Sequence, residues 1–240
     1  MGVSWVLEYP SSSSTVQSLF WKLKGHFESQ GAELCGAFSV DSSIFVPSHE
    51  RLQHAVHLYH HSDFPESSFT VSQPVASSTQ QQQPAPTQPS EESPLFAVSD
   101  RHFDKLLAKM RDVLSAKPQA AVDLRGSQYA LRGDVAIKVG AASVGTTAKA
   151  VIVEVEYKPC SVPFMCNDLM RELVELACLP GTLSTSLSLP AYTATVRRKM
   201  EFTPVDTIAQ YHEIFTNLRK ADQQPSSGSS TPMGPSLLIS

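Results

Sequence analysis

The stretch from Val135 to Leu179, VAIKVGAASVGTTAKAVIVEVEYKPCSVPFMCNDLMRELVELACL, decides the fold. Two apolar runs, 135–142 and 150–157, are separated by Gly145 and followed by a pattern of helical period. Two adjacent strands that lead into a helix, with charge on one face of the second strand, predict a compact sheet-based module. The stretch has no glycine-rich phosphate loop, Gly-x-Ser-x-Gly or Cys-x-x-Cys, so it favours a binding module over an enzyme.

Similar patterns along the chain predict further strands and helices. Runs of strand character lie at 32–40, 52–60, 69–71, 95–98, 121–125, 128–131 and 192–200. Stripes of helical period lie at 14–31, 100–117, 167–179 and 203–220. Gly126, Gly133 and Gly145 separate successive strands, and such short links favour antiparallel hairpins. The residues alone therefore predict an α+β fold with an antiparallel sheet.

The helix at 203–220 has the clearest start signal and a broad apolar stripe. Thr203, Pro204 and Asp206 form a capping box with proline in the first turn. The apolar stripe consists of Ile208, Tyr211, Ile214, Phe215 and Leu218. We expect this stripe to pack on the sheet. Three residues of the same helix are expected to face water: Glu213, Asn217 and Arg219.

Two segments are rich in Ser, Gln, Gly and Pro rather than in apolar residues. They cover 72–94, including four consecutive glutamines at 80–83, and 221–240. Such segments cannot bury enough apolar surface to offset the entropy of ordering. We therefore expect a single domain over 1–220, with a disordered insertion at 72–94 and a disordered tail at 221–240. The run at 95–98 is predicted to return from the insertion and pair with 69–71.

Composition excludes several classes of protein. The 240 residues carry a net charge of −4 and only 18% charged residues, so no strong field attracts nucleic acid or an acidic membrane. No window approaches 18 consecutive apolar residues, the length that a membrane span needs. Four cysteines, at 35, 160, 166 and 178, do not make a disulfide framework. We expect a soluble protein of a reducing intracellular compartment.

Histidines cluster in the predicted strand at 52–60 and just after it. Alternation along a strand places His54 and His60 on one face and His57 and His61 on the other. At most two of them could share an ion, and no carboxylate stands at a helpful spacing. We do not expect a metal site here.

Two further groups of reactive or charged residues have plain structural interpretations. Cys160 and Cys166 lack a zinc-ligand spacing and have no histidine or basic residue close in sequence, so they are expected to be apolar fillers. The basic cluster at 197–199 lacks interleaved aromatic residues. It is expected to end a solvated strand rather than contact nucleic acid.

The pair Glu154 and Glu156 allows two interpretations. Residues two apart on a strand project from one face, and inside a closed barrel such carboxylates could hold a divalent metal against a triphosphate. The sequence pattern Glu-x-Glu-x-Lys, which ends at Lys158, resembles the pattern of the triphosphate tunnel metalloenzymes. Such a tunnel also needs several cations on neighbouring strands, and the preceding strand offers only Lys138. We therefore expect the two glutamates to form a solvated face opposite an apolar face.

Taken together, the motifs resemble those of the Mediator complex subunit 20 family, which belongs to the head module of an RNA polymerase II coactivator. The resemblance runs over nearly the whole chain outside 72–94 and 181–204. Its residues are Met1–Val3, Gly31–Glu33, Phe103, Asp104, Leu106, Arg125, Gly126, Tyr129, Lys138–Gly140, Val153–Tyr157, Pro159, Cys160, Cys166, Asp206, Thr207, Gln210, Tyr211, Glu213, Phe215, Leu218 and Arg219.

The resemblance implies an antiparallel β-barrel-like sheet with flanking helices, similar to the triphosphate tunnel enzymes but without their catalysis. It implies a non-enzymatic scaffold subunit in the nucleus, in a heteromeric complex with Mediator subunit 18 and other head-module subunits. No direct contact with nucleic acid or membrane is implied. No residue is expected to be catalytic, to bind a cofactor or to bind a metal. The alternative is a metal-dependent triphosphate hydrolase of the tunnel type centred on Glu154 and Glu156.

Overall fold

The computed structural model describes residues 2–10, 13–49, 52–74, 94–177, 179 and 189–223. Most of the predicted insertion and tail, at 75–93 and 224–240, lies outside these residues. The flanking elements continue into both segments, because a strand includes 72–74 and a helix includes 221–223. No helix in the described part of the chain is long and apolar enough to cross a membrane.

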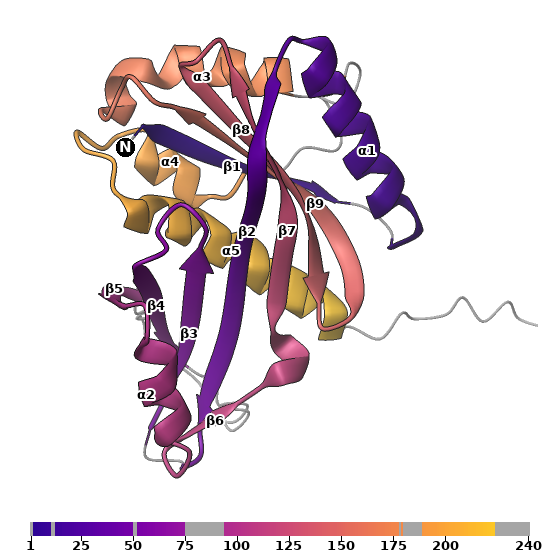
Figure 1. Cartoon of the computed structure of the whole chain (residues 1–240). Coiled ribbons are helices and arrows are strands. Elements are labelled where there is room, and N and C mark those ends of the chain that lie inside the picture. Colours follow the sequence, from indigo (N-terminus) through magenta and orange to yellow (C-terminus); the bar gives the residue numbers. More distant parts are fainter. Residues whose placement is uncertain are drawn as a thin grey trace, which may run out of the picture.

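The described residues form one sheet in which all strand pairs are antiparallel. The strands are β1 (Val3–Pro10), β2 (Glu33–Pro47), β3 (His54–His61), β4 (Ser67–Pro74), β5 (Leu95–Asp100), β6 (Leu114–Ala116), β7 (Val122–Leu131), β8 (Val135–Val144) and β9 (Thr147–Tyr157). Their order is β1-β9-β8-β7-β2-β3-β4-β5, and β6 pairs with β2 outside this path. The sheet curls into a half-barrel (Figure 1). The predicted α+β fold with a barrel-like antiparallel sheet is confirmed.

Within the described residues, five α-helices pack around this sheet. They are α1 (Ser13–Ser29), α2 (Phe103–Lys109), α3 (Pro163–Ala177), α4 (Tyr192–Val196) and α5 (Pro204–Gln223), and a 3-10 turn, η1, spans Pro118–Ala120. One half of the predicted capping box of α5 is observed, since the Asp206 carboxylate accepts a hydrogen bond of 2.9 Å from the Thr203 backbone N–H, while the Thr203 hydroxyl donates to the same carboxylate at 2.9 Å. Gly31 follows α1 with φ +82°, the left-handed conformation that ends a helix and that glycine adopts most easily.

Several predicted elements differ from the observed ones, and strand β1 was not predicted. The second helix ends at Lys109 rather than near 117, and Leu114 starts strand β6, which pairs with β2. The segment 192–200 was expected to be a strand, but it begins with helix α4. The two strands predicted around Gly126 are one continuous strand, β7. At Gly126 a Cβ atom would overlap the carbonyl oxygen of Val139 on β8. The glycine therefore permits the two strands to approach closely and does not form a turn.

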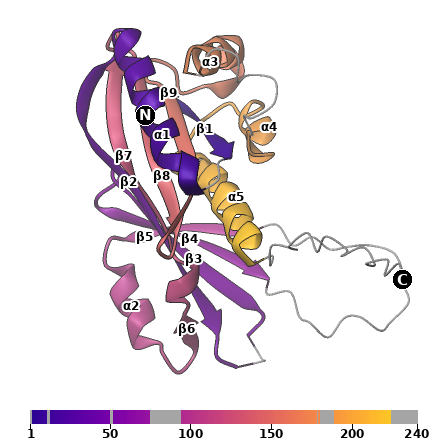
Figure 2. The ribbon, with the colours of Figure 1, turned by 90° about the vertical axis from the view of Figure 1, so that its right-hand side faces the viewer.

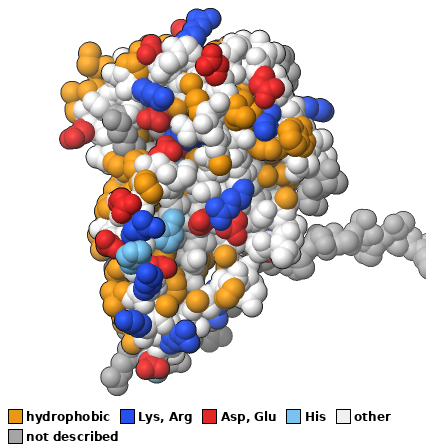
Figure 3. All heavy atoms as spheres, viewed as in Figure 1, with side chains coloured by type: hydrophobic (Ala, Val, Ile, Leu, Met, Phe, Trp, Pro, Cys, Tyr) orange, Lys and Arg blue, Asp and Glu red, His pale blue; other side chains and the backbone are white. Residues whose placement is uncertain are grey.

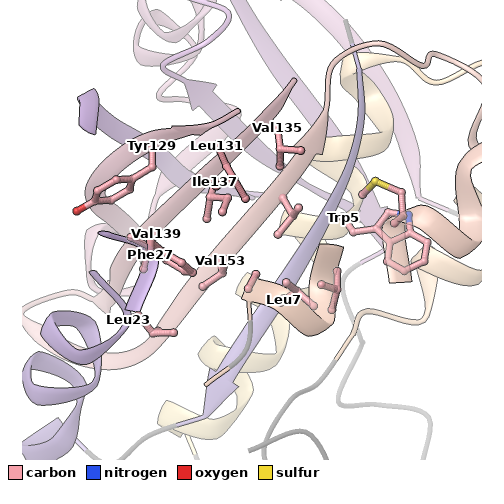
Figure 4. Close-up of a cluster of buried hydrophobic side chains, with 14 of the residues drawn as sticks. Trp5, Leu7, Leu23, Phe27, Tyr129, Leu131, Val135, Ile137, Val139 and Val153 are labelled. Atoms are coloured by element: carbon pink, nitrogen blue, oxygen red, sulfur yellow. The ribbon is translucent and has the colours of Figure 1, made fainter. Parts of the chain in front are cut away.

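One face of the sheet packs against α1 and α3. Figure 4 shows part of this cluster, in which side chains from β1, β7, β8 and β9 meet two residues of α1. The labelled members are Trp5, Leu7, Leu23, Phe27, Tyr129, Leu131, Val135, Ile137, Val139 and Val153. Every second residue of these strands points into the cluster, as the strand period requires. We refer to this side as the α1 face.

The other face of the sheet holds α5, and we call it the α5 face. The helix contacts β1, β8, β4 and β5, so it spans the concavity from one end of the sheet to the other (Figures 1 and 2). All five residues of the predicted apolar stripe, Ile208, Tyr211, Ile214, Phe215 and Leu218, are buried there. The stripe therefore belongs to the chain's own core, as the amphipathic pattern predicts.

Gln210 of α5 joins the helix to the edge strand β1. Its side-chain carbonyl accepts a hydrogen bond of 3.0 Å from the Val6 N–H, and its amide donates one of 3.0 Å to the Ser4 carbonyl. The amide group thus takes the place of a neighbouring strand's peptide along this edge. Unpaired edge groups invite association with other chains, so Gln210 both anchors α5 and blocks the edge of β1 at Ser4 and Val6.

We predict that Phe215→Ala lowers the free energy of unfolding by about 3–5 kcal/mol, because the ring is fully buried and stacks on Tyr59 with centroids 6.1 Å apart. Urea unfolding of the purified protein measures the change. Asn217→Ala, on the exposed side of the same helix, is the control and should change stability by less than about 0.5 kcal/mol. Equal stability of the two variants would contradict the placement of Phe215 in the core.

Candidate functional site

Lys138 and Glu154 form a buried ion pair between β8 and β9. The two residues are register partners, the Lys138 Nζ lies 2.8 Å from Glu154 Oε1, and each side chain is only 1% exposed. The expectation that Glu154 lies on a solvated face is wrong. The strand has no solvated face at this point, because α1 and α3 cover one side of the sheet and α5 covers the other.

Two more carboxylates reach the same ammonium group. Asp63, in the turn after β3, contacts Nζ of Lys138, and Glu156 Oε2 lies 3.4 Å from it. The side chain of Glu156 is also largely buried, and its Oε1 accepts a hydrogen bond of 3.1 Å from the Gly2 N–H. We call the set of Lys138, Glu154, Glu156, Asp63 and the adjacent His61 the charge centre. Its members come from β3, β8, β9 and the turn that follows β3.

His61 and Tyr211 hold the other oxygen of Glu154. The Asp63 N–H donates to His61 Nδ1 at 3.1 Å, so Nδ1 acts as an acceptor. The proton of the neutral ring is then on Nε2, which lies 3.2 Å from Glu154 Oε2 and donates to it. The Tyr211 hydroxyl of α5 donates to the same oxygen at 2.8 Å. Glu154 therefore directs Oε2 to two neutral donors and Oε1 to the ammonium group.

These contacts keep the pair ionised. Burial on its own raises the pKa of Glu154, but the neighbouring Lys138 ammonium and the His61 hydrogen bond outweigh it and hold the pKa well below its ordinary value. Burial lowers the pKa of Lys138, and the carboxylates of Glu154, Asp63 and Glu156 more than reverse this, so its pKa is raised. Burial and the Glu154 charge raise the pKa of Tyr211 well above its usual value, so it remains a donor.

The charge centre does not fit a resident divalent ion. Potential ligand atoms of His61, Asp63 and Glu154 lie within 4.8 Å of one another, which is close enough for one ion. The Lys138 ammonium, however, contacts both carboxylates of this group, and a second cation at that point would be repelled. His61 Nε2 carries a proton in this arrangement and offers no lone pair. Of the described residues, no other Lys or Arg contacts these carboxylates.

A second buried polar cluster lies near the C-terminal end of α5. Arg219 is 5% exposed, so the expectation that it faces water is wrong. Its guanidinium donates to the Ala120 carbonyl at 2.8 Å and to the Ser42 hydroxyl at 2.7 Å, and it lies 3.4 Å from His57 Nδ1. The His57 ring meets that of His212 at 4.9 Å. This cluster ties the end of α5 to β2, β3 and η1.

The histidines divide as the strand alternation predicts, but they do not form one site. His57 and His61 are buried and His54 is exposed, with His60 between these extremes. His61 belongs to the charge centre and His57 to the Arg219 cluster. The sequence could not indicate the partner of each ring, because the partners are distant along the chain. Glu154 lies 93 residues from His61, and Arg219 lies 162 residues from His57.

The remaining candidates have structural roles. Cys166 is buried, and burial with its neighbour Cys160 raises its pKa to about 12, so the thiol stays protonated as expected of a filler. The basic cluster lies at the end of α4 instead of on a strand. There the Arg197 guanidinium stacks on the Trp5 ring at 4.4 Å, and Lys199 pairs with Asp206.

Comparison with known proteins assigns the family. The family model described as the TATA-binding related factor (TRF) of subunit 20 of Mediator complex matches residues 1–216. The chain belongs to this family. Mediator of RNA polymerase II transcription subunit 20 from Anopheles gambiae is 33% identical over 238 residues, which cover 94% of this chain and 98% of the relative. The human protein of that name is 28% identical, with 95% and 99% covered.

Among solved structures, the fold has a distant likeness to a putative adenylyl cyclase from Hippeastrum that is described as having a dominant triphosphatase activity. The TM-score is 0.41 and the identity is 10%, with 85% of this chain and 99% of that chain covered. At this level the likeness carries no argument about this chain's chemistry.

We predict that acidification from pH 6.5 to 5 destabilises the protein through His57 and His212. Burial, aided by Arg219, lowers their pKa values to about 3 and about 4, from about 6.5 in the unfolded chain. The unfolded chain then binds protons first, so the stability contributed by neutral rings is complete above pH 6.5 and is lost as the pH falls toward 4. Each ring contributes up to about 1.4 kcal/mol per pH unit in this window.

Urea unfolding at several pH values between 5 and 7.5 measures this slope. Replacing both rings, His57→Gln with His212→Gln, should flatten the slope, whereas His49→Gln at an exposed position should leave it unchanged. A double variant with the wild-type slope would show that the two rings do not titrate as proposed.

Proposed function

We propose that this chain is a non-enzymatic subunit of the Mediator complex and acts in the nucleus as a coregulator of transcription by RNA polymerase II. The match of residues 1–216 to the subunit 20 family carries the proposal. Relatives bear that name and align with this chain over nearly their full lengths. Membership of this family supports a scaffold role.

The interior of the half-barrel supports the non-enzymatic part of the proposal. A triphosphate hydrolase needs free carboxylates for a metal and several cations for the phosphates. In the charge centre, the carboxylates of Glu154 and Asp63 contact the Lys138 ammonium, and the remaining oxygen of Glu154 is held by His61 and Tyr211. The helix α5 also fills the concavity in which a substrate would lie.

The surface supports protein partners rather than nucleic acid. On the face seen in Figure 3, acidic and basic side chains are interspersed and form no continuous basic area. The two ends of the sheet differ. Gln210 occupies the edge of β1, whereas β5 ends the other side of the strand order and carries exposed Leu95 and Val98. Exposed edges of this kind are natural pairing sites for another chain. We propose the β5 edge as the partner-binding edge, with Mediator subunit 18 as the expected partner among head-module subunits.

Absence of catalysis is tested directly. Purified wild-type protein should release no phosphate from nucleoside triphosphates or from triphosphate-ended RNA in the presence of Mg²⁺ or Mn²⁺. The Glu154→Gln/Glu156→Gln variant is the matched control, because any contaminating activity should be equal in both preparations. Turnover that is present in the wild type and lost in the double variant would contradict the non-enzymatic proposal and support the tunnel-type alternative.

The partner edge is tested by co-purification from cells that express tagged protein. Leu95→Asp with Val98→Asp should reduce recovery of subunit 18 about tenfold or more, because charge on a pairing edge opposes strand addition. Trp21→Asp on α1, also an exposed apolar residue, is the control and should retain the partner. If the β5 variant folds and still recovers subunit 18, the β5 edge is not the interface. If the wild type recovers no Mediator subunit, the proposed function is wrong.

A further inference from the structure

The Lys138 ammonium occupies the point toward which the carboxylates of the charge centre converge. Oxygen atoms of Glu154, Asp63 and Glu156 surround Nζ, with two contacts of 2.8 and 3.4 Å and a third, to Asp63, also in direct contact. Carboxylate oxygens that converge on one point are the ligands that a hard divalent cation takes, and buried carboxylates need a nearby positive charge. Here that positive charge is supplied by a side chain of the same chain.

The Glu154 carboxylate is held in one orientation by hydrogen bonds, as the carboxylate ligands of metal ions are. His61 Nε2 and the Tyr211 hydroxyl both donate to Oε2, which fixes the carboxylate and leaves Oε1 for the cation. The His61 ring is itself fixed by the Asp63 N–H. Outer hydrogen bonds of this type orient the carboxylate ligands of metal centres. In this centre they orient the carboxylate toward the Lys138 ammonium.

We propose that Lys138 is a built-in substitute for a divalent cation, and that its ammonium group is what excludes metal ions from the charge centre. The expected ligand of the vacated centre is an oxygen-preferring ion such as Mn²⁺, bound by Glu154, Asp63 and Glu156, with His61 as a hydrogen-bond donor rather than a ligand. An ion has a route to this position, because the side chains of Asp63 and Glu156 are 27% and 14% exposed at the rim of the otherwise buried centre.

Removal of the ammonium group tests the proposal. Lys138→Ala should leave buried carboxylates without a counter-charge, lower the melting temperature, and create one Mn²⁺ site per chain. Electron paramagnetic resonance of Mn²⁺ measures free and bound ion, and thermal unfolding gives a second readout. At a hundredfold excess of Mn²⁺ over its dissociation constant, the melting temperature of the variant should rise by about 5–10 °C. The wild-type protein should show neither saturable Mn²⁺ binding at this centre nor a shift.

Two further variants separate the site from unspecific effects. In Lys138→Ala/Glu154→Gln the central ligand is neutral while its shape is kept, so Mn²⁺ affinity should fall at least tenfold. Lys138→Arg keeps the positive charge and should exclude Mn²⁺ as the wild type does. Refolding of Lys138→Ala with and without Mn²⁺ covers the case of a variant that does not fold without the ion, since the ion should then restore folding.

Several results would overturn the proposal. One is a Lys138→Ala chain that binds no more Mn²⁺ than the wild type, or as much as its Glu154→Gln derivative. Another is a Lys138→Ala chain that fails to fold at any Mn²⁺ concentration while the double variant folds. Saturable Mn²⁺ binding by the wild type that is lost in Glu154→Gln would show that Lys138 does not exclude the ion. These outcomes are independent of whether the wild type recovers Mediator subunits.

Discussion

The ion pair between Lys138 and Glu154 is the interaction on which the rest of the sheet depends. Both faces of β8 and β9 are covered around Lys138 and Glu154, so these two charges have no access to bulk water and must be matched inside the protein. The strand register supplies the opposite charge, because it places Lys138 of β8 directly beside Glu154 of β9. A slip of one residue would place Lys138 opposite Val153 or Val155 and separate Glu154 from the ammonium group that offsets its burial. The cost of such a slip fixes one alignment of the strands. The pair therefore contributes specificity more than net stability, because desolvation offsets much of its Coulomb attraction.

Helix α5 connects this centre to the two ends of the sheet. Tyr211 reaches Glu154, Gln210 pairs with the edge of β1, and Arg219 binds Ser42 on β2 and Ala120 in η1. These polar contacts lie on different sides of the helix, between apolar residues that pack on the sheet. A helix with polar groups buried in several directions has few alternative positions, because each shift would leave several donors and acceptors unpaired. The half-barrel thus keeps its curvature around a fixed central element.

The sequence predicts the elements with a strong period and fails where the tertiary structure determines the meaning of a pattern. The α5 stripe, its capping box and the β7–β8–β9 hairpins follow from local rules. The solvated face assigned to Glu154 does not hold, because alternation of polar and apolar residues cannot reveal that a helix from the far end of the chain covers the polar side. For the same reason, Arg219 was placed in water. Gly126 was taken as a turn, since the local signal for a turn and for close strand approach is the same residue.

The pairing of residues far apart in sequence also explains why the charge centre could not be recognised from its motif. Glu-x-Glu on β9 indicates either a metal-binding pair or a solvated face, and the choice between them depends on residues elsewhere. The deciding residue is Lys138, whose importance comes from its register position opposite Glu154. A lysine on a neighbouring strand is compatible with substrate binding if it reaches a phosphate, and with a closed structural centre if it reaches the carboxylates. The observed 2.8 Å contact, with Tyr211 and His61 on the remaining oxygen, leaves Glu154 with its hydrogen-bonding capacity used within the chain. A strand pattern compatible with catalysis therefore serves here to hold a sheet together.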